Sequence, residues 1–185
     1  MHRVLLVGFG PFAGRTHNGS QTLVHSVAPD DLPSVSLRRT VLAVRWGQVE
    51  AELVPLVADF QPQLILGLGE GGPGGVTVET VGRNVRRGTD EADTPPPTPT
   101  VDDAGPAEKQ ANLALDSAWS DCAQVAVSTD AGAFLCNNLL YAIAEQPDVV
   151  AGFIHLPPQG DAAPDAYVAS YKPVILEIIK RNLSN

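Results

Sequence analysis

Short apolar runs alternate along the chain with longer segments whose apolar residues recur at helical spacing. The runs are rich in β-branched residues and bounded by glycine, proline or polar residues, which is typical of buried strands. Strands are therefore predicted at residues 4–7, 37–44, 63–68, 76–81, 124–127 and 149–154. Helices are predicted at about 20–27, 48–60, 133–145 and 165–182, with another beginning at residue 106.

Proline and short polar residues set the details of these helices. Pro55 should kink the second helix and Pro173 should interrupt the last one, because proline lacks the N–H of a helical hydrogen bond. Pro106 fits the first position of its helix. The Ser-Thr-Asp sequence at 128–130 should cap the helix that follows it.

The alternation of strands and helices through the whole chain predicts the fold class. We expect a single α/β domain spanning residues 1–185, built as a three-layer α/β/α sandwich around a mainly parallel, mixed central sheet. In such sheets ligands bind outside the carboxyl ends of the strands. The loops that follow Val7, Leu68, Val127 and Ile154 should therefore gather on one edge.

The composition is that of an ordinary globular domain and argues against several functions. Hydrophobic residues make up 44% and charged residues 18% of the 185 residues, enough to bury one core. The net charge of -9 would repel a phosphate backbone, so nucleic acid is not expected as a partner. No segment approaches the roughly 20 apolar residues of a membrane span. With two cysteines and no signal-peptide pattern, we expect a cytoplasmic protein without a disulfide framework.

The segment from residue 86 to residue 103 breaks the alternation. It contains four prolines, repeated threonines and five acidic residues, and almost nothing apolar that could anchor it in a core. Long irregular loops in compact domains are often lids. We therefore expect a flexible lid loop at about 86–103, next to the edge where ligands should bind.

Cys136 is the first candidate for chemistry. It falls in the first turns of the helix at 133–145, where unpaired N–H groups and the positive end of the helix dipole favour a thiolate. Position alone favours a plainer interpretation, in which a buried cysteine packs the helix against the sheet. A base close to the thiol would change that balance.

His155 is the candidate base. It directly follows the strand at 149–154, and the prolines at 157 and 158 stop the chain there, so that its imidazole can point into the crevice. Neutral imidazole near pH 7 can take a thiol proton and later deliver it to a leaving amine. Taken alone, His155 fits equally well as a core histidine bonded to the backbone.

A carboxylate usually orients the base of such a hydrolase. Glu79 is the best candidate because it falls in an apolar segment, where an unpaired charge would be costly to bury. The alternation along its strand also allows Glu79 to face water. Asp130 and Glu70 are the alternatives for the orienting role.

Four blocks of sequence resemble the signature segments of pyroglutamyl peptidase type I, also called pyrrolidone-carboxylate peptidase, a family of cysteine peptidases. They read GFGPF at 8–12, ETVGRN at 79–84, a block at 128–141 that includes AGAFLCNN, and GFIHLP at 152–157. The blocks occur in the order of the family and extend over nearly the whole chain.

The resemblance implies an activity and a set of residues. The activity is hydrolysis of the amide bond after an N-terminal pyroglutamyl residue through a thioester acyl-enzyme, with peptides as partners, no cofactor and no metal. Cys136 would be the nucleophile, His155 the general base and acid, and Glu79 the orienting carboxylate. The five-membered lactam would bind among Phe9, Phe12, Asn18, Gly69, Glu70, Phe134 and Leu135. The family also implies a homo-oligomer, a tetramer in its known members.

The chain departs from the family in several places. Thr80 replaces an arginine, Asn138 a histidine, and Gly19 a proline. The family's Ala-Arg-Ile-Pro-Asp-Asn, whose arginine helps to stabilise the oxyanion, has no clear counterpart. Arg86 or Arg87 would have to take its place.

Two other functions compete with this one. The first is a degenerate member of the family that binds pyroglutamyl ends without turnover, which the missing arginine suggests. The second is a nucleotide-binding or nucleoside-processing domain, suggested by the glycines at 8–10 and 67–75. Its signal is weak, because the first loop lacks the third glycine of a dinucleotide-binding fingerprint and no Gly-Lys-Ser/Thr is present.

Overall fold

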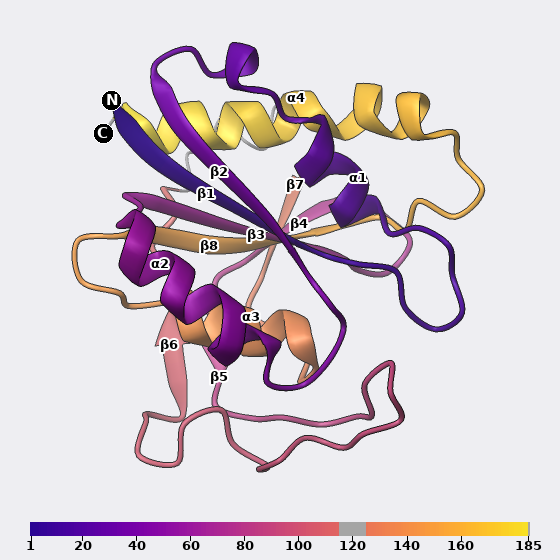
Figure 1. Cartoon of the computed structure of the whole chain (residues 1–185), viewed down its shortest axis with the longest axis vertical. Helices are drawn as coiled ribbons and strands as arrows, with labels where there is room; N and C mark the ends of the chain where they lie inside the picture. Colours follow the sequence, from indigo (N-terminus) through magenta and orange to yellow (C-terminus); the bar gives the residue numbers. More distant parts are fainter. Residues whose placement is uncertain (115–124, 185) are drawn as a thin grey trace.

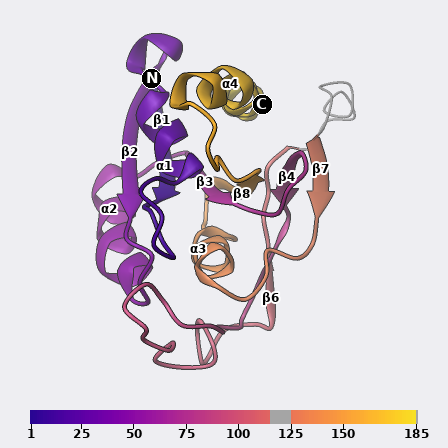
Figure 2. The same cartoon turned by 90° about the vertical axis from the view of Figure 1, so that its right-hand side faces the viewer.

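The computed structural model describes residues 1–114 and 125–184. Among these residues, six strands form one sheet in the order β2-β1-β3-β8-β4-β7, with helices on both faces (Figures 1 and 2). β4 is antiparallel to β8, and the other neighbouring pairs are parallel. The predicted α/β fold with a mainly parallel, mixed sheet is confirmed. The strand bounds are β1 His2–Phe9, β2 Val35–Leu42, β3 Leu64–Glu70, β4 Val76–Glu79, β7 Val125–Ser128 and β8 Val150–Leu156.

The helices form the two outer layers (Figure 1). α1 (Gly19–Ser26) and α4 (Pro164–Leu183) cover one face of the sheet. The other face is covered by a π-helical turn η2 (Val49–Leu53), by α2 (Val54–Phe60) and by α3 (Leu135–Ile143). A short 3-10 turn η1 (Pro29–Asp31) leads into β2, and the small ribbon of β5 (Val81–Arg83) and β6 (Glu108–Gln110) packs on α3. No helix of the described residues is both long enough and apolar enough to cross a membrane.

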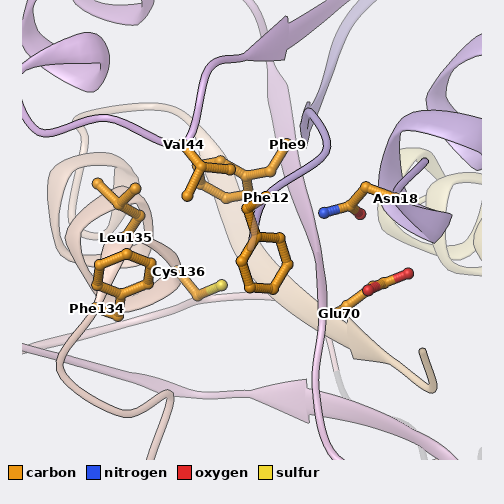
Figure 3. A pocket seen from close by; sticks show the side chains of 8 residues that line it. All are labelled: Phe9, Phe12, Asn18, Val44, Glu70, Phe134, Leu135 and Cys136. Atoms are coloured by element: carbon orange, nitrogen blue, oxygen red, sulfur yellow. The ribbon is translucent and has the colours of Figure 1, made fainter. Parts of the chain in front are cut away.

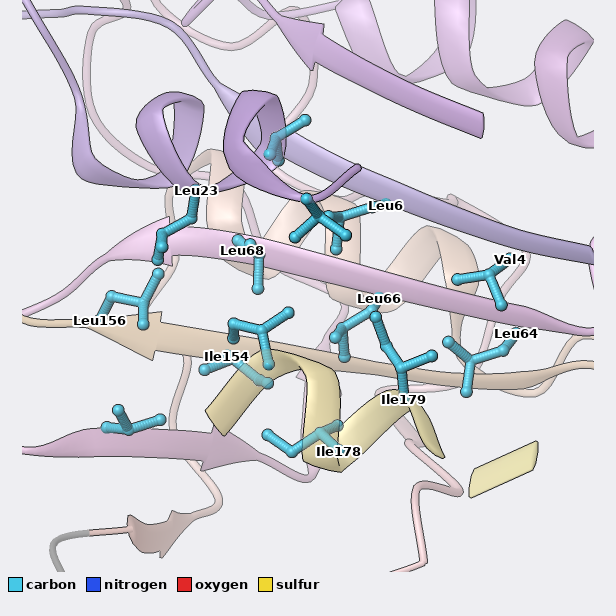
Figure 4. Packing of buried hydrophobic residues seen from close by; sticks show 14 of the residues in the cluster. Val4, Leu6, Leu23, Leu64, Leu66, Leu68, Ile154, Leu156, Ile178 and Ile179 are labelled. Atoms are coloured by element: carbon cyan, nitrogen blue, oxygen red, sulfur yellow. The ribbon is translucent and has the colours of Figure 1, made fainter. Parts of the chain in front are cut away.

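The central strands are buried on both faces, which explains why their sequences are continuous apolar runs. In β1, Val4 and Leu6 pack in the cluster under α1 and α4, whereas Leu5 and Val7 pack in the cluster on the opposite face. Figure 4 shows the first cluster, where isoleucines of α4 lie over the side chains of β1, β3 and β8. All four β1 residues are fully buried.

The two prolines inside the predicted helices have different settings. α4 continues through Pro173 without interruption, so that prediction was wrong. Tyr167 and Ile175, on either side of the proline, are buried against the sheet, and this packing holds the helix where one hydrogen bond is lost. Pro55 lies in the first turn of α2, directly after η2, so it marks the change from π to α geometry.

The chain after residue 105 forms a strand where a helix was predicted. The helix expected from Pro106 is absent at its start, because Glu108–Gln110 pairs antiparallel with Val81–Arg83 as β6. Its backbone groups bond to a segment that lies more than twenty residues earlier, and local sequence cannot reveal such pairing. The predicted strand at 76–81 is correspondingly divided at Thr80 into β4 and β5.

Candidate active site

The site is built at the carboxyl ends of β1, β3 and β8, which run parallel to one another. The loop after Val127 does not open on that edge as predicted. β7 is parallel to β4, and β4 is antiparallel to β8, so β7 points the other way. Residues 129–134 instead return beside the sheet and bring the start of α3 beneath β3. The chemistry is therefore assembled from one sheet edge and one helix start.

Cys136 is the second residue of α3 and faces the end of β3. A Cβ atom placed on Gly69 would lie 2.9 Å from Sγ of Cys136, so only glycine at this position leaves room for the sulfur. The N-cap residue Phe134 makes no side-chain capping bond. The predicted capping residues bond within their own loop, since Ser128 accepts from the amide of Asp130. The first-turn N–H groups of α3 therefore receive no side-chain cap from Phe134, and Cys136 lies in that first turn, at the positive end of the helix dipole.

The base and its carboxylate meet across two antiparallel strands. The Nδ1–H of His155, on β8, donates to Oε1 of Glu79, on β4, at 2.8 Å. Both side chains are well shielded, with 16% and 4% of their surfaces exposed. The hydrogen bond fixes which imidazole nitrogen faces the carboxylate and leaves Nε2 for the sulfur side.

Electrostatics at this pair favour the charged forms. Burial alone would lower the pKa of His155, but its interactions with Cys136 and Glu79 raise it to about 9. Burial would likewise raise the pKa of Glu79, but the bond from His155 and the nearby Ser128 hydroxyl lower it. Oε2 of Glu79 is buried and has no partner in hydrogen-bond geometry within the described residues, so His155 and proximity to Ser128 carry its stabilisation.

A small, mainly apolar cavity of about 70 Å³ opens beside the sulfur (Figure 3). Figure 3 shows the ring of Phe12 between Cys136 on one side and Asn18 and Glu70 on the other. All the residues that the sequence assigns to substrate binding line this cavity, except Gly69, which contacts the sulfur from β3. The lining consists of Phe9, Phe12, Asn18, Val44, Glu70, Phe134, Leu135 and Cys136.

The sequence did not indicate two residues of this region: Val44, which lines the cavity, and Trp46, which packs against Phe134. Val44 lies two residues beyond β2, where the predicted strand ended, and its place in the loop could not be distinguished from ordinary core. Trp46 packs edge-on against Phe134 with ring centroids 5.3 Å apart, and its Nε1 donates to Gly88 O. An aromatic residue in a short loop between two predicted elements was the available signal.

The alternatives for the orienting role have other partners. Asp130 is 61% exposed at its side chain and pairs with Arg83 at 3.0 Å. The carboxylate of Glu70 is almost fully buried and binds Arg15 and two backbone amides. Glu79 is thus the carboxylate that the structure joins to His155.

The segment at 86–103 is anchored by polar groups where apolar ones are lacking. Asn84 accepts the amides of Val101 and Asp102. Asp90 is 8% exposed and accepts three backbone N–H groups, one of them from Trp46. These bonds fold the segment back on itself and on the loop after β2.

Its two arginines differ sharply. Arg86 is 7% exposed, and its guanidinium donates to Oδ1 of Asn138, to Thr98 and, in a short ion pair, to Glu50. Arg87 is exposed, and its side chain makes no hydrogen bond or ion pair with any residue in 1–114 or 125–184. Its amide donates to Ala133 O, in the loop that leads to α3.

Comparison with known proteins agrees with this geometry. The family model described as pyroglutamyl peptidase matches residues 2–175. The pyrrolidone-carboxylate peptidases of Klebsiella pneumoniae and Streptomyces coelicolor are 34% and 32% identical, over 85% and 94% of this chain and 78% and 86% of their own lengths.

Solved structures give the same result. The crystal structure of pyroglutamyl peptidase I from Bacillus amyloliquefaciens is 25% identical, has a TM-score of 0.79 and covers 93% of this chain and 94% of its own. The pyrrolidone carboxyl peptidase of Thermococcus litoralis shares the fold with a TM-score of 0.83 at 22% identity, over 100% of this chain and 94% of its own. The chain belongs to the pyroglutamyl peptidase family.

Proposed function

We propose that this protein removes N-terminal pyroglutamyl residues from peptides as a cysteine peptidase. The observation that carries the proposal is the bond from His155 to Glu79 close to the Cys136 sulfur, which packs on Gly69, the β3 partner of His155, beside a small apolar cavity. A nucleophile, a base and an orienting carboxylate in that order are the parts of a cysteine hydrolase. The size of the cavity suits a single small ring.

The reaction begins with the proton of the Cys136 thiol on Nε2 of His155. The raised pKa of His155 favours this arrangement, since the imidazole then holds its proton at neutral pH. The thiolate attacks the carbonyl carbon of the pyroglutamyl residue, and the carbonyl oxygen becomes an oxyanion. Collapse of this intermediate breaks the C–N bond, and the imidazolium gives its proton to the departing amine.

The second half of the reaction releases the acyl group. The thioester on Cys136 is attacked by water, whose proton passes to the now neutral His155. The second tetrahedral intermediate expels the thiolate and frees pyroglutamate. Throughout, Glu79 holds the imidazole through Nδ1 and stabilises its positive charge.

The oxyanion has two sources of support. The first-turn N–H groups of α3 lie beside Cys136 and carry the positive end of the helix dipole. Of the two arginines in the segment at 86–103, Arg87 is the one that can approach the oxyanion, because Arg86 is held by Glu50 and Asn138. The proposed lid movement of the segment at 86–103 would carry Arg87 toward the site.

Recognition of the lactam combines shape and fixed polar groups. Phe12 and Phe134 provide aromatic walls for a flat ring. Asn18 uses one Nδ2–H for Gly10 O, at 3.0 Å, which leaves the second for a ligand carbonyl. A proline residue lacks the ring carbonyl, and sites built on such bonds can reject the analogue by roughly 10⁴-fold.

The direct test is hydrolysis of a pyroglutamyl amide that carries a chromogenic leaving group, beside the matching prolyl amide. We expect turnover of the first alone, and its loss in Cys136→Ala. A wild-type protein that binds the pyroglutamyl compound without releasing the chromophore would instead be a binding protein of this family. Turnover of both amides at similar rates would contradict the proposed lactam recognition.

A further inference from the structure

The aromatic wall of the cavity beside Cys136 stands on an exposed loop. Phe12 is only half-buried, and Ala13 and Gly14, which follow it, both have positive φ angles, 54° and 72°. This turn is closed by a bond from the amide of Arg15 to Phe12 O at 3.1 Å. The turn folds the Arg15 side chain back over the ring, with its guanidinium carbon 4.7 Å from the ring centroid.

Glu70 fixes the other end of that guanidinium. Its Oε2 accepts from Nη1 of Arg15 at 2.5 Å, and its Oε1 accepts the amides of Gly19 at 2.6 Å and Gln159 at 3.0 Å. The Glu70 side chain is 3% exposed, whereas that of Arg15 is 44% exposed. One rigid carboxylate at the end of β3 therefore links the first loop, the start of α1 and the loop that follows His155.

Without Arg15 this arrangement loses two supports together. The exposed face of the Phe12 ring loses the cation that covers it, so the ring gains rotational freedom. Oε2 of the buried Glu70 carboxylate loses its charged partner at the wall of the cavity. Both effects act on the space in which the proposed mechanism holds the lactam, and neither touches Cys136 or His155.

We propose that Arg15 is a positioning residue for substrate, which holds the Phe12 wall of the lactam cavity with Glu70 as its fixed anchor. This inference rests on the proposed function, because it assigns the cavity to the pyroglutamyl ring. It predicts a specific kinetic signature. Loss of Arg15 weakens binding in the ground state and the transition state alike, so KM rises while kcat is nearly unchanged.

The chain offers a matched control at a distance from the site. Arg38 also pairs with an acid, Asp59, at 2.6 Å, and also lies over an aromatic ring, that of Phe60, at 4.4 Å. It is 40% exposed, close to the exposure of Arg15. Arg38→Met therefore removes the same kinds of contact without touching the cavity.

The experiment compares Arg15→Met, Arg15→Lys and Arg38→Met with the wild-type protein. Two quantities are measured: KM and kcat for the chromogenic pyroglutamyl amide, and the calorimetric Kd of L-pyroglutamate. An ion pair with one exposed partner, together with an exposed cation–π contact, predicts a rise in KM and Kd of about tenfold in Arg15→Met, with kcat within about twofold. Arg15→Lys, which keeps the charge without the planar group, should fall between. Arg38→Met should match the wild type.

A double substitution tests the anchor. Glu70→Gln keeps an acceptor for the amides of Gly19 and Gln159 but removes the charge that binds Arg15. In that background Arg15→Met should change KM much less than it does alone.

The inference is overturned if Arg15→Met leaves KM and Kd at wild-type values, or if kcat falls as much as KM rises. A wild-type protein that binds L-pyroglutamate but shows no turnover would refute the peptidase function alone, and the Kd comparison would still decide the role of Arg15. A wild-type protein with neither binding nor turnover would overturn both.

Discussion

Gly69 is the position where one added methyl group should most directly disturb the chemistry. A Cβ atom there would lie 2.9 Å from Sγ of Cys136 and 2.8 Å from the Cζ atom of Phe153. Ordinary contacts between such atoms begin at about 3.5 Å, so Gly69→Ala requires the sulfur to move by about 0.6 Å. Phe153 is fully buried and cannot take up the shift alone.

The displacement should cost activity more than stability. A misplacement near 1 Å between reacting groups can cost about 100-fold in rate, so kcat of Gly69→Ala should fall by roughly 10- to 100-fold. Overpacking typically costs about 1–3 kcal/mol, part of which is offset by the reduced entropy of the unfolded chain. The midpoint of thermal unfolding should therefore fall by about 2–8 °C.

Gly72→Ala is the control for this substitution. A Cβ atom on Gly72 meets nothing within 4 Å, and its φ is not in the left-handed region. Its turnover of the chromogenic amide should stay within about twofold of the wild type, and its unfolding midpoint should be unchanged. Wild-type kcat in Gly69→Ala, or equal losses in the two variants, would refute the packing argument around the sulfur.

Three further predictions follow from the same geometry. Glu79→Gln removes a carboxylate that helps to raise the pKa of His155, so the alkaline limb of the pH profile of kcat/KM should move from near pH 9 to lower pH. An alkaline limb that stays near pH 9 would contradict the pairing of His155 with Glu79. Protonation of His155 should stabilise the folded protein, because its folded pKa of about 9 lies above the unfolded value of 6.5. This contribution should be complete below about pH 6.5 and should disappear as the pH rises through 9. Urea unfolding across this range measures the free energy of unfolding, and a wild-type value that does not change with pH would contradict the prediction. Arg86→Met should speed limited proteolysis within 86–103, because it removes the bonds to Glu50 and Asn138. Arg87→Met should slow turnover with little effect on proteolysis. The reverse pattern would exchange the roles of the two arginines.

The sequence predicts the sheet and the outer helices well because their signals are local. β1 and β3 are apolar on both faces, and the runs at 4–7 and 63–68 lie within or largely within them. The strand β6 gives no such signal, since its residues are polar and mostly exposed and are held by pairing with β5. Pro173 misleads for the opposite reason, because tertiary packing overrides a strong local preference.

The candidate site could be predicted as residue types but not as contacts. The positions of Cys136 and His155 at element ends indicate reactive groups, but the choice of the carboxylate depends on contacts between strands. Both β3 and β4 lie beside β8, yet the carboxylate of Glu70 binds Arg15 and two backbone amides, whereas that of Glu79 accepts from His155. No sequence pattern encodes these contacts. The same holds for the anchoring of Arg15 by Glu70, which joins residues 55 positions apart.

The proposed mechanism requires Cys136 to form a thioester with the pyroglutamyl group. Acid quenching during turnover of the chromogenic amide, followed by proteolytic digestion and mass spectrometry, locates any acyl group on the chain. We expect a pyroglutamyl adduct on the peptide that contains Cys136, absent from Cys136→Ala, and none on Cys122, which lies outside the described residues. An adduct on Cys122, or undiminished turnover in Cys136→Ala, would contradict the thioester mechanism.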